Sequence, residues 1–127
     1  MERYLIDTNV VSGYFSASFS TSGMDFMDSI IDSIPNLSVI TQIELLCWDS
    51  DTNTMQKVKD FIADSLVLGI DDNTIAQCVL LRKGKKIKTP DAIIAATALA
   101  NGYTIVTVNE RDFVNISGLK IVNPARF

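Results

Sequence analysis

Four carboxylates, each beside an apolar segment, are the residues of this sequence best suited to chemistry. They are Asp7, Glu44, Asp91 and Asp112. Asp7, Glu44 and Asp112 each follow an apolar segment by one to four residues, whereas Asp91 opens one. Carboxylates gathered at one place repel one another unless a cation lies between them. Because Mg²⁺ and Mn²⁺ prefer oxygen ligands, the set predicts a site for a hard divalent cation.

Each acid also has a purely structural interpretation. Asp7 is suited to cap a helix that starts near Asn9. The segment TQIE fits a capping box in which Glu44 reaches back to the Thr41 amide. Asp91 follows Thr-Pro, as an acid in the first turn of a helix does, and Asp112 fits a turn. Taken singly these interpretations are good, and it is the set of four that favours a metal site.

The sequence contains no histidine, and this narrows the possible chemistry. It excludes a Ser-His-Asp triad, a Cys-His pair and a histidine-ligated zinc site. Acid–base work would fall to carboxylates, lysines or a metal-bound water. The two cysteines, Cys47 and Cys78, form no C-x-x-C pair and stand among apolar residues. We expect them to be small buried hydrophobic residues in a reducing compartment.

The net charge of −4 argues against nonspecific wrapping of nucleic acid. The basic residues are nevertheless concentrated in one run, which has two interpretations. As cations at a helix C-terminus, with Gly84 as the stop, they would complement the helix dipole. As a positive strip leading into Asp91, they would contact RNA phosphates. The run consists of Arg82, Lys83, Lys85, Lys86 and Lys88.

The length of 127 residues suits one domain, 1–127, with one substantial core. No apolar run is long enough to span a bilayer, and the N-terminus does not look like a signal peptide. We therefore expect a soluble cytoplasmic protein without a membrane partner.

The elements that would position the acids alternate along the chain. Residues 91–100 are apolar almost all round, which predicts a buried helix that stops at Gly102. A Ser/Thr/Gly-rich stretch at 16–23 predicts a flexible loop. Strands are predicted at 3–6, 37–40, 66–68, 103–108 and 119–122. Helical spacing lies between them, in Phe26, Met27, Ile30, Ile31 and Ile34, in Val58, Phe61 and Ile62, and in Ile75, Val79 and Leu80.

This alternation predicts an α/β fold with a mostly parallel sheet sandwiched between helices. Such folds bind ligands at the carboxyl ends of the strands. All four acids fall near that edge of the sheet.

At these acids the sequence resembles PIN-domain proteins, specifically the VapC-type ribonuclease toxins of toxin–antitoxin modules. The resemblance runs nearly end to end. It consists of YLIDTNVVS at 4–12, SVITQIEL at 38–45, TPDAIIAATALANGYTIVTVNERDF at 89–113 and GLKIVNP at 118–124. The first motif is weak by itself, but four motifs in order and at suitable spacing are specific.

The resemblance implies a PIN fold and an endoribonuclease that depends on Mg²⁺ or Mn²⁺, with one or two ions. It also implies an RNA substrate, a cognate antitoxin and a homodimer. The family's acidic positions fall on the four carboxylates, and supporting polar positions fall on Thr8, Asn9, Thr107 and Asn109. Some relatives carry an acid at the position of Asn109. The amide found here bears on how well a second metal would be held.

Two further interpretations stay open. The chain could be a non-catalytic PIN-like module that binds RNA or a protein. The aromatic residues Phe15, Phe19 and Trp48 could anchor the core or loops, or line a groove for an antitoxin helix or a dimer contact.

Overall fold

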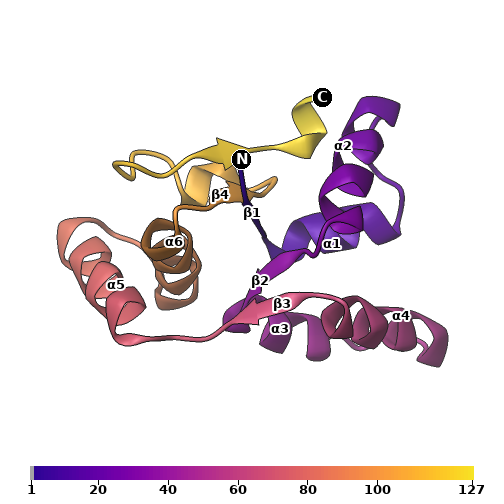
Figure 1. Ribbon diagram of the computed structural model, residues 1–127, viewed down its shortest axis with the longest axis horizontal. Helices are drawn as coiled ribbons and strands as arrows, with labels where there is room; N and C mark the ends of the chain where they lie inside the picture. The colour runs from indigo at the N-terminus through magenta and orange to yellow at the C-terminus, as the bar shows by residue number, and fades with distance from the viewer. Residues whose placement is uncertain (1) are drawn as a thin grey trace.

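The chain folds as a five-stranded sheet with helices on both faces, which confirms the predicted α/β class (Figure 1). The computed structural model describes residues 2–127. The strands are β1 (Tyr4–Ile6), β2 (Asn36–Ser38), β3 (Leu66–Leu68), β4 (Thr104–Val106) and β5 (Ile121–Val122). The helices are α1 (Thr8–Phe15), α2 (Thr21–Asp32), α3 (Val39–Leu46), α4 (Thr52–Ala63), α5 (Asp72–Gly84) and α6 (Thr89–Asn101), with short 3-10 helices η1 (Glu110–Asp112) and η2 (Pro124–Arg126).

All strand pairs are parallel, in the order β3-β2-β1-β4-β5. β1 lies in the middle, with Leu5 in register with Ile105 of β4. The carboxyl ends of parallel strands meet at one edge, so the residues that follow β1, β2 and β4 are neighbours in space.

Side chains alternate across the sheet and divide the core in two. Leu5 and Ile105 point to the face covered by α6, whereas Ile6 and Val106 point to the face covered by α1 to α4. Figure 1 shows α5 and α6 on one side of the strands and α1 and α2 on the other.

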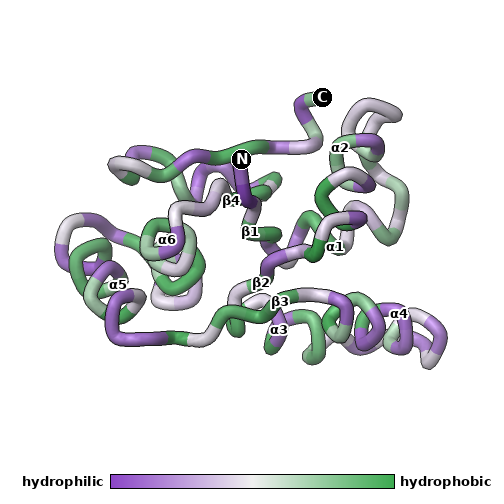
Figure 2. Tube along the Cα trace, viewed as in Figure 1, coloured by the Kyte–Doolittle hydropathy of each residue, from purple (hydrophilic) through white to green (hydrophobic). Residues whose placement is uncertain are grey.

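α6 is buried because small residues occupy most of its surface. Ala95, Ala96 and Ala98 are fully buried, and the helix lies between the sheet and α5 (Figure 1). It ends as predicted at Gly102, whose φ of 70° is a left-handed conformation that favours glycine. α4 instead alternates polar and apolar residues, as Figure 2 shows, because only one of its faces meets the core.

Several predicted boundaries are wrong. The loop predicted at 16–23 ends early, since Ser20 caps α2 by accepting from the Gly23 N–H at 3.2 Å. The strand predicted at 37–40 gives way to α3 at Val39, because the Ser38 hydroxyl accepts from the Ile40 N–H at 3.1 Å. β4 and β5 are also shorter than predicted.

The prediction of two buried cysteines is also wrong. Cys47 is the C-cap of α3 and is exposed, and Cys78 on α5 is half-buried. Among residues 2–127 there is no helix with the length and hydropathy needed to cross a bilayer.

Candidate functional site

Asp7 lies at the centre of a hydrogen-bonded group at the carboxyl end of β1. Its carboxylate is only 6% exposed. One oxygen accepts from the Thr8 N–H at 2.8 Å, so Asp7 is the N-cap of α1, as its structural interpretation predicted. The other oxygen accepts from the Thr107 hydroxyl at 2.9 Å and from the Asn9 side-chain amide at 3.1 Å. Capping therefore accounts for one oxygen, and the other is held by side chains.

Thr107 and Asn9 fix this group to β4. Thr107 follows β4 and is fully buried. Its hydroxyl donates to Asp7 and accepts from the Asn9 amide at 3.3 Å and the Asn109 N–H at 3.0 Å. The Asn9 carbonyl accepts from the Val108 N–H at 3.1 Å, which determines the orientation of its amide. These contacts hold the ends of β1 and β4 together around one carboxylate.

Glu44 reaches the same group from α3. Its carboxylate accepts from the Thr8 hydroxyl at 2.6 Å, although the residue is exposed. The predicted capping box is wrong, because Thr41 lies inside α3 and Ser38 is the N-cap. Glu44 is therefore free of a capping role and faces the end of β1.

The carboxylates influence one another electrostatically. Burial raises the pKa of Asp7, and the nearby Glu44 charge raises it further, against the hydrogen bonds from Thr107, Thr8 and Asn9. Burial likewise raises the pKa of half-buried Asp91, in the first turn of α6. Repulsion from Asp112, Asp7 and Glu44 adds to this, and Lys88 opposes it. Asp7, Glu44 and Asp112 therefore all lie close enough to Asp91 to raise its pKa.

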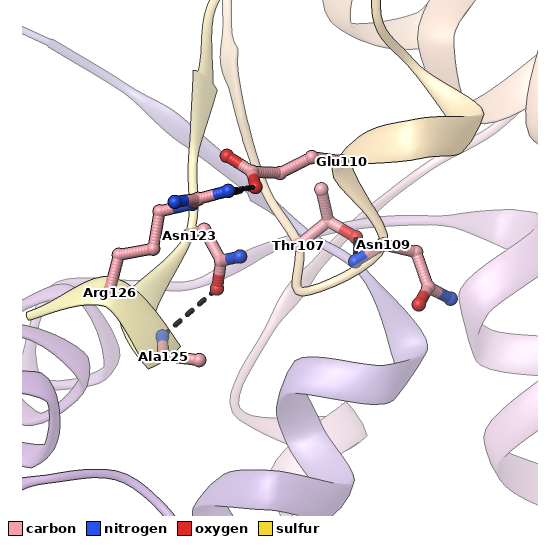
Figure 3. Close-up of polar contacts among 6 residues, drawn as sticks. All are labelled: Thr107, Asn109, Glu110, Asn123, Ala125 and Arg126. Carbon is pink, nitrogen blue, oxygen red and sulfur yellow. Dashed lines mark hydrogen bonds and ion pairs between the residues drawn. The ribbon is translucent and has the colours of Figure 1, made fainter.

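Asp112 is presented by η1, directly after the Thr107 loop. It is exposed, and its N–H donates to the Asn109 carbonyl at 3.1 Å. The neighbouring Glu110 accepts from Arg126 of η2, whose closest nitrogen lies 2.6 Å away (Figure 3). In the same view the Asn109 side chain points away from this ion pair. The C-terminus thus lies against the segment that carries Asp112.

The acids are near one another but are not assembled as ligands. Within residues 2–127, no three acidic, cysteine or histidine side chains converge closely enough to hold a metal ion. The chemistry of the donor set nevertheless fits a hard divalent cation, since it consists of carboxylates and hydroxyls without histidine. A cation would also offset the repulsion that raises the pKa of Asp7 and Asp91.

An open cavity of 390 Å³ lies on one side of this group. Of the four acids only Glu44 lines it, together with Thr8, Asn9 and Asn109. Ser12 and Trp48 complete the lining and were not singled out as site residues from the sequence. For Ser12 the signal was helical spacing, because it follows Thr8 by four positions within α1. Trp48 lies beyond the C-cap of α3, so no helical period placed it. Another cavity, of 560 Å³, lies at the opposite edge, around residues such as Tyr4, Asn36 and Leu66.

The basic run divides between its two interpretations. Arg82 donates to the Ile87 carbonyl at 2.8 Å and Lys85 to the Val114 carbonyl at 2.5 Å, so both stabilise the chain around the end of α5. Lys88, the N-cap of α6, is the member whose charge acts on Asp91. Lys83 and Lys86 are exposed.

Comparisons with known proteins agree with this fold. The PIN domain family model matches residues 4–119. The plasmid stability protein StbB of Pseudomonas syringae pv. tomato is 33% identical over 135 residues, which cover 94% of this chain and 96% of StbB. Ribonuclease VapC1 of Rickettsia felis is 47% identical over 36 residues, 28% of this chain and 27% of that protein.

Among solved structures, the toxin–antitoxin complex from Klebsiella pneumoniae contains a chain of similar fold. The TM-score is 0.73 at 27% identity, over 95% of this chain and 97% of that one.

Proposed function

We propose that this chain, which belongs to the PIN domain family, is a VapC-type toxin and an endoribonuclease dependent on Mg²⁺ or Mn²⁺. One observation carries the proposal: a buried Asp7, whose two oxygens are both held by hydrogen bonds, stands at the carboxyl ends of parallel strands, and it joins Glu44 and Asp112 in raising the pKa of Asp91. The name of the related ribonuclease VapC1 supports the RNA substrate.

Asp7, Glu44, Asp91 and Asp112 would hold the cation. When bound, the cation supplies Lewis-acid stabilisation of the phosphoryl oxygens and lowers the pKa of a water. Thr107 and Asn9 hold the Asp7 carboxylate in one orientation, and Thr8 does the same for Glu44. Such outer contacts keep ligands ready for the metal and reduce the reorganisation needed during reaction.

The test is cleavage of total RNA by the purified protein in Mg²⁺, in Mn²⁺ and in EDTA. We expect cleavage in either metal and none in EDTA, and we expect Asp7→Asn and Asp91→Asn each to lose activity. Asp25→Asn is a matched control, because it removes an exposed acid on α2. Full activity in either site variant would contradict the assignment.

One observation favours a second candidate function, a non-catalytic module that binds RNA or a protein. It is the lack of a ready ligand cluster within residues 2–127. Calorimetric titration with Mn²⁺ separates the two. If the chain is a nuclease, Mn²⁺ binds to the wild type and not to Asp7→Asn. If it is a non-catalytic module, the wild type binds little Mn²⁺ and cleaves no RNA.

An antitoxin and a second copy of this chain are the proposed protein partners. Similarity to a chain of the Klebsiella pneumoniae toxin–antitoxin complex supports the first. An exposed apolar stripe on α5, made of Ile75, Val79 and Leu80, supports the second, since such a stripe is normally covered.

A further inference from the structure

A second open cavity, of 520 Å³, adjoins the candidate site. It lies between α1, α4 and the segment that follows α3, and Ser12 and Trp48 line both this cavity and the one beside Glu44. The two hollows therefore adjoin at these two side chains. A chain of nucleotides held with one phosphate at the carboxylates can extend from the first hollow into the second.

Trp48 offers a flat surface between the two hollows. It is half-buried and packs against the core beneath α1 and α4, which holds the ring in place. No aromatic ring of residues 2–127 stacks on it. Phe15, on the far wall, is by contrast engaged with Phe61 edge to face at 5.9 Å. Bases of single-stranded RNA are bound by stacking on exposed aromatic faces of this kind.

The remaining lining suits a nucleotide rather than an apolar ligand. Lys57 is the only cation of the lining, is exposed, and takes no part in the single ion pair of residues 2–127. It is therefore available to a phosphate. The hydroxyl of Thr54 can donate or accept at a base edge, and Asp49 can accept from an exocyclic amine.

We propose that this cavity is a nucleotide subsite, in which one base of the RNA stacks on Trp48 and a phosphate beside it pairs with Lys57. The proposal rests on the proposed nuclease function and concerns how that nuclease holds its substrate. Stacking matters here because the chain carries a net charge of −4 and cannot hold RNA by charge alone.

Kinetics with RNA in Mn²⁺ provide the first test. Trp48→Ala is expected to raise KM by about tenfold, the size expected for one lost stacking contact. The loss is expected in KM more than in kcat, because stacking on Trp48 holds the RNA alike in the ground state and in the transition state. Trp48→Phe keeps an aromatic face and is expected to recover most of the loss. Circular dichroism and the melting temperature show whether Trp48→Ala and Trp48→Phe keep the fold.

Lys57→Gln is expected to raise KM and to reduce the salt dependence of RNA binding. Lys59→Gln is the matched control, since Lys59 is an exposed lysine of the same helix that does not line the cavity. Equal effects of the two variants would overturn the role of Lys57.

Fluorescence provides a direct readout, because Trp48 is the only tryptophan of the chain. The Asp7→Asn variant, in which cleavage is expected to be lost, is titrated with a single-stranded RNA dodecamer of mixed sequence. We expect the indole emission to be quenched and to saturate together with the anisotropy of a fluorescein-labelled copy. Binding without a change in emission would overturn the proposal.

The two levels of failure are distinguishable. If the wild type cleaves no RNA, the proposed function fails. If it cleaves RNA and both Trp48 variants keep the wild-type KM, only the subsite fails. If Trp48→Ala keeps the wild-type KM but no longer co-purifies with the proposed antitoxin, the cavity docks a protein, and the proposal is overturned.

Discussion

The ionisation of Asp7 links the site to the stability of the whole chain. Burial raises the pKa of this carboxyl above its unfolded value, so the folded state prefers the protonated form. The charged form therefore lowers the free energy of unfolding at neutral pH. This penalty is relieved as the pH falls through the folded pKa, because the native state then binds the proton first.

We therefore expect the metal-free wild type to gain stability relative to Asp7→Asn as the pH is lowered from 7 towards the ordinary pKa of an aspartate, about 4. Urea unfolding in EDTA at several pH values measures the difference. The variant removes this titration and also the contribution of the Asp7 charge to the raised pKa of Asp91, and both changes act in the same direction. A difference that stays constant with pH would contradict the raised pKa of Asp7.

Thr107 is the second residue with a separable role. Thr107→Val removes the hydroxyl that donates to Asp7 and accepts from Asn9 and Asn109. Leaving a buried charged oxygen short of a donor costs about 1–3 kcal/mol of unfolding free energy. We also expect a fall in RNA cleavage of about 10- to 100-fold, as for other residues that orient metal ligands.

Thr97→Val is the matched control for this prediction. Thr97 is also fully buried, but its hydroxyl donates only to the Ile93 carbonyl of its own helix, at 2.7 Å. It is expected to keep full cleavage activity. Equal losses in the two variants would show that burial of a threonine, and not its contact with Asp7, is what matters.

At the scale of elements, the sequence predicted the order of strands and helices because each has a distinct apolar period. The strand at 66–68 and the end of α6 at Gly102 match the structure. Local patterns failed at the start of α3, since the predicted capping box at Thr41 is wrong and the N-cap is Ser38, which lies within the strand predicted at 37–40. Which one forms depends on where β2 stops pairing with β3.

The same limit applies to the site. Spacing placed the four acids near one edge, but the contacts of Thr107 with Asp7 span 100 positions of sequence. The inclusion of Trp48 depends on how α3 packs against α1. Neither the contact of Thr107 with Asp7 nor the place of Trp48 follows from a helical or strand pattern in the sequence. Both became visible only in the tertiary structure.

The competing caps of α3 lead to a prediction. Ser38→Ala removes the observed N-cap and is expected to lower the free energy of unfolding by about 1 kcal/mol. Thr41→Val is expected to be neutral or stabilising, because the Thr41 hydroxyl is buried without a hydrogen-bond partner in residues 2–127. Urea denaturation measures both. A larger loss in Thr41→Val than in Ser38→Ala would contradict the cap assignment.

At the scale of the molecule, the exposed face of α5 has a pattern that can pair with itself. A row of exposed residues runs from Asp72 through Ala76 and Val79 to Lys83, and Ile75 and Leu80 of the apolar stripe lie on either side of it. In an antiparallel pair of α5 helices related by a two-fold axis, Asp72 of each copy lies opposite Lys83 of the other, and the apolar residues lie between them. This is the self-complementarity that a two-fold interface needs.

We therefore expect the wild type to sediment as a dimer and Val79→Glu as a monomer, because the substitution places two carboxylates at the centre of the interface. Sedimentation velocity at micromolar concentration measures this. Val114→Glu is the matched control, since Val114 is another exposed valine, outside α5.

The charges of Asp72 and Lys83, at the two ends of this row, make the test specific for an antiparallel pairing. Asp72→Lys alone would place lysine opposite lysine and weaken the dimer, and the double variant Asp72→Lys/Lys83→Asp would restore opposite charges and recover it. Each pair is exposed, so the expected effect is below about 1 kcal/mol and is largest at low ionic strength. Failure of the double variant to recover the dimer would exclude this antiparallel arrangement, even if α5 forms the interface.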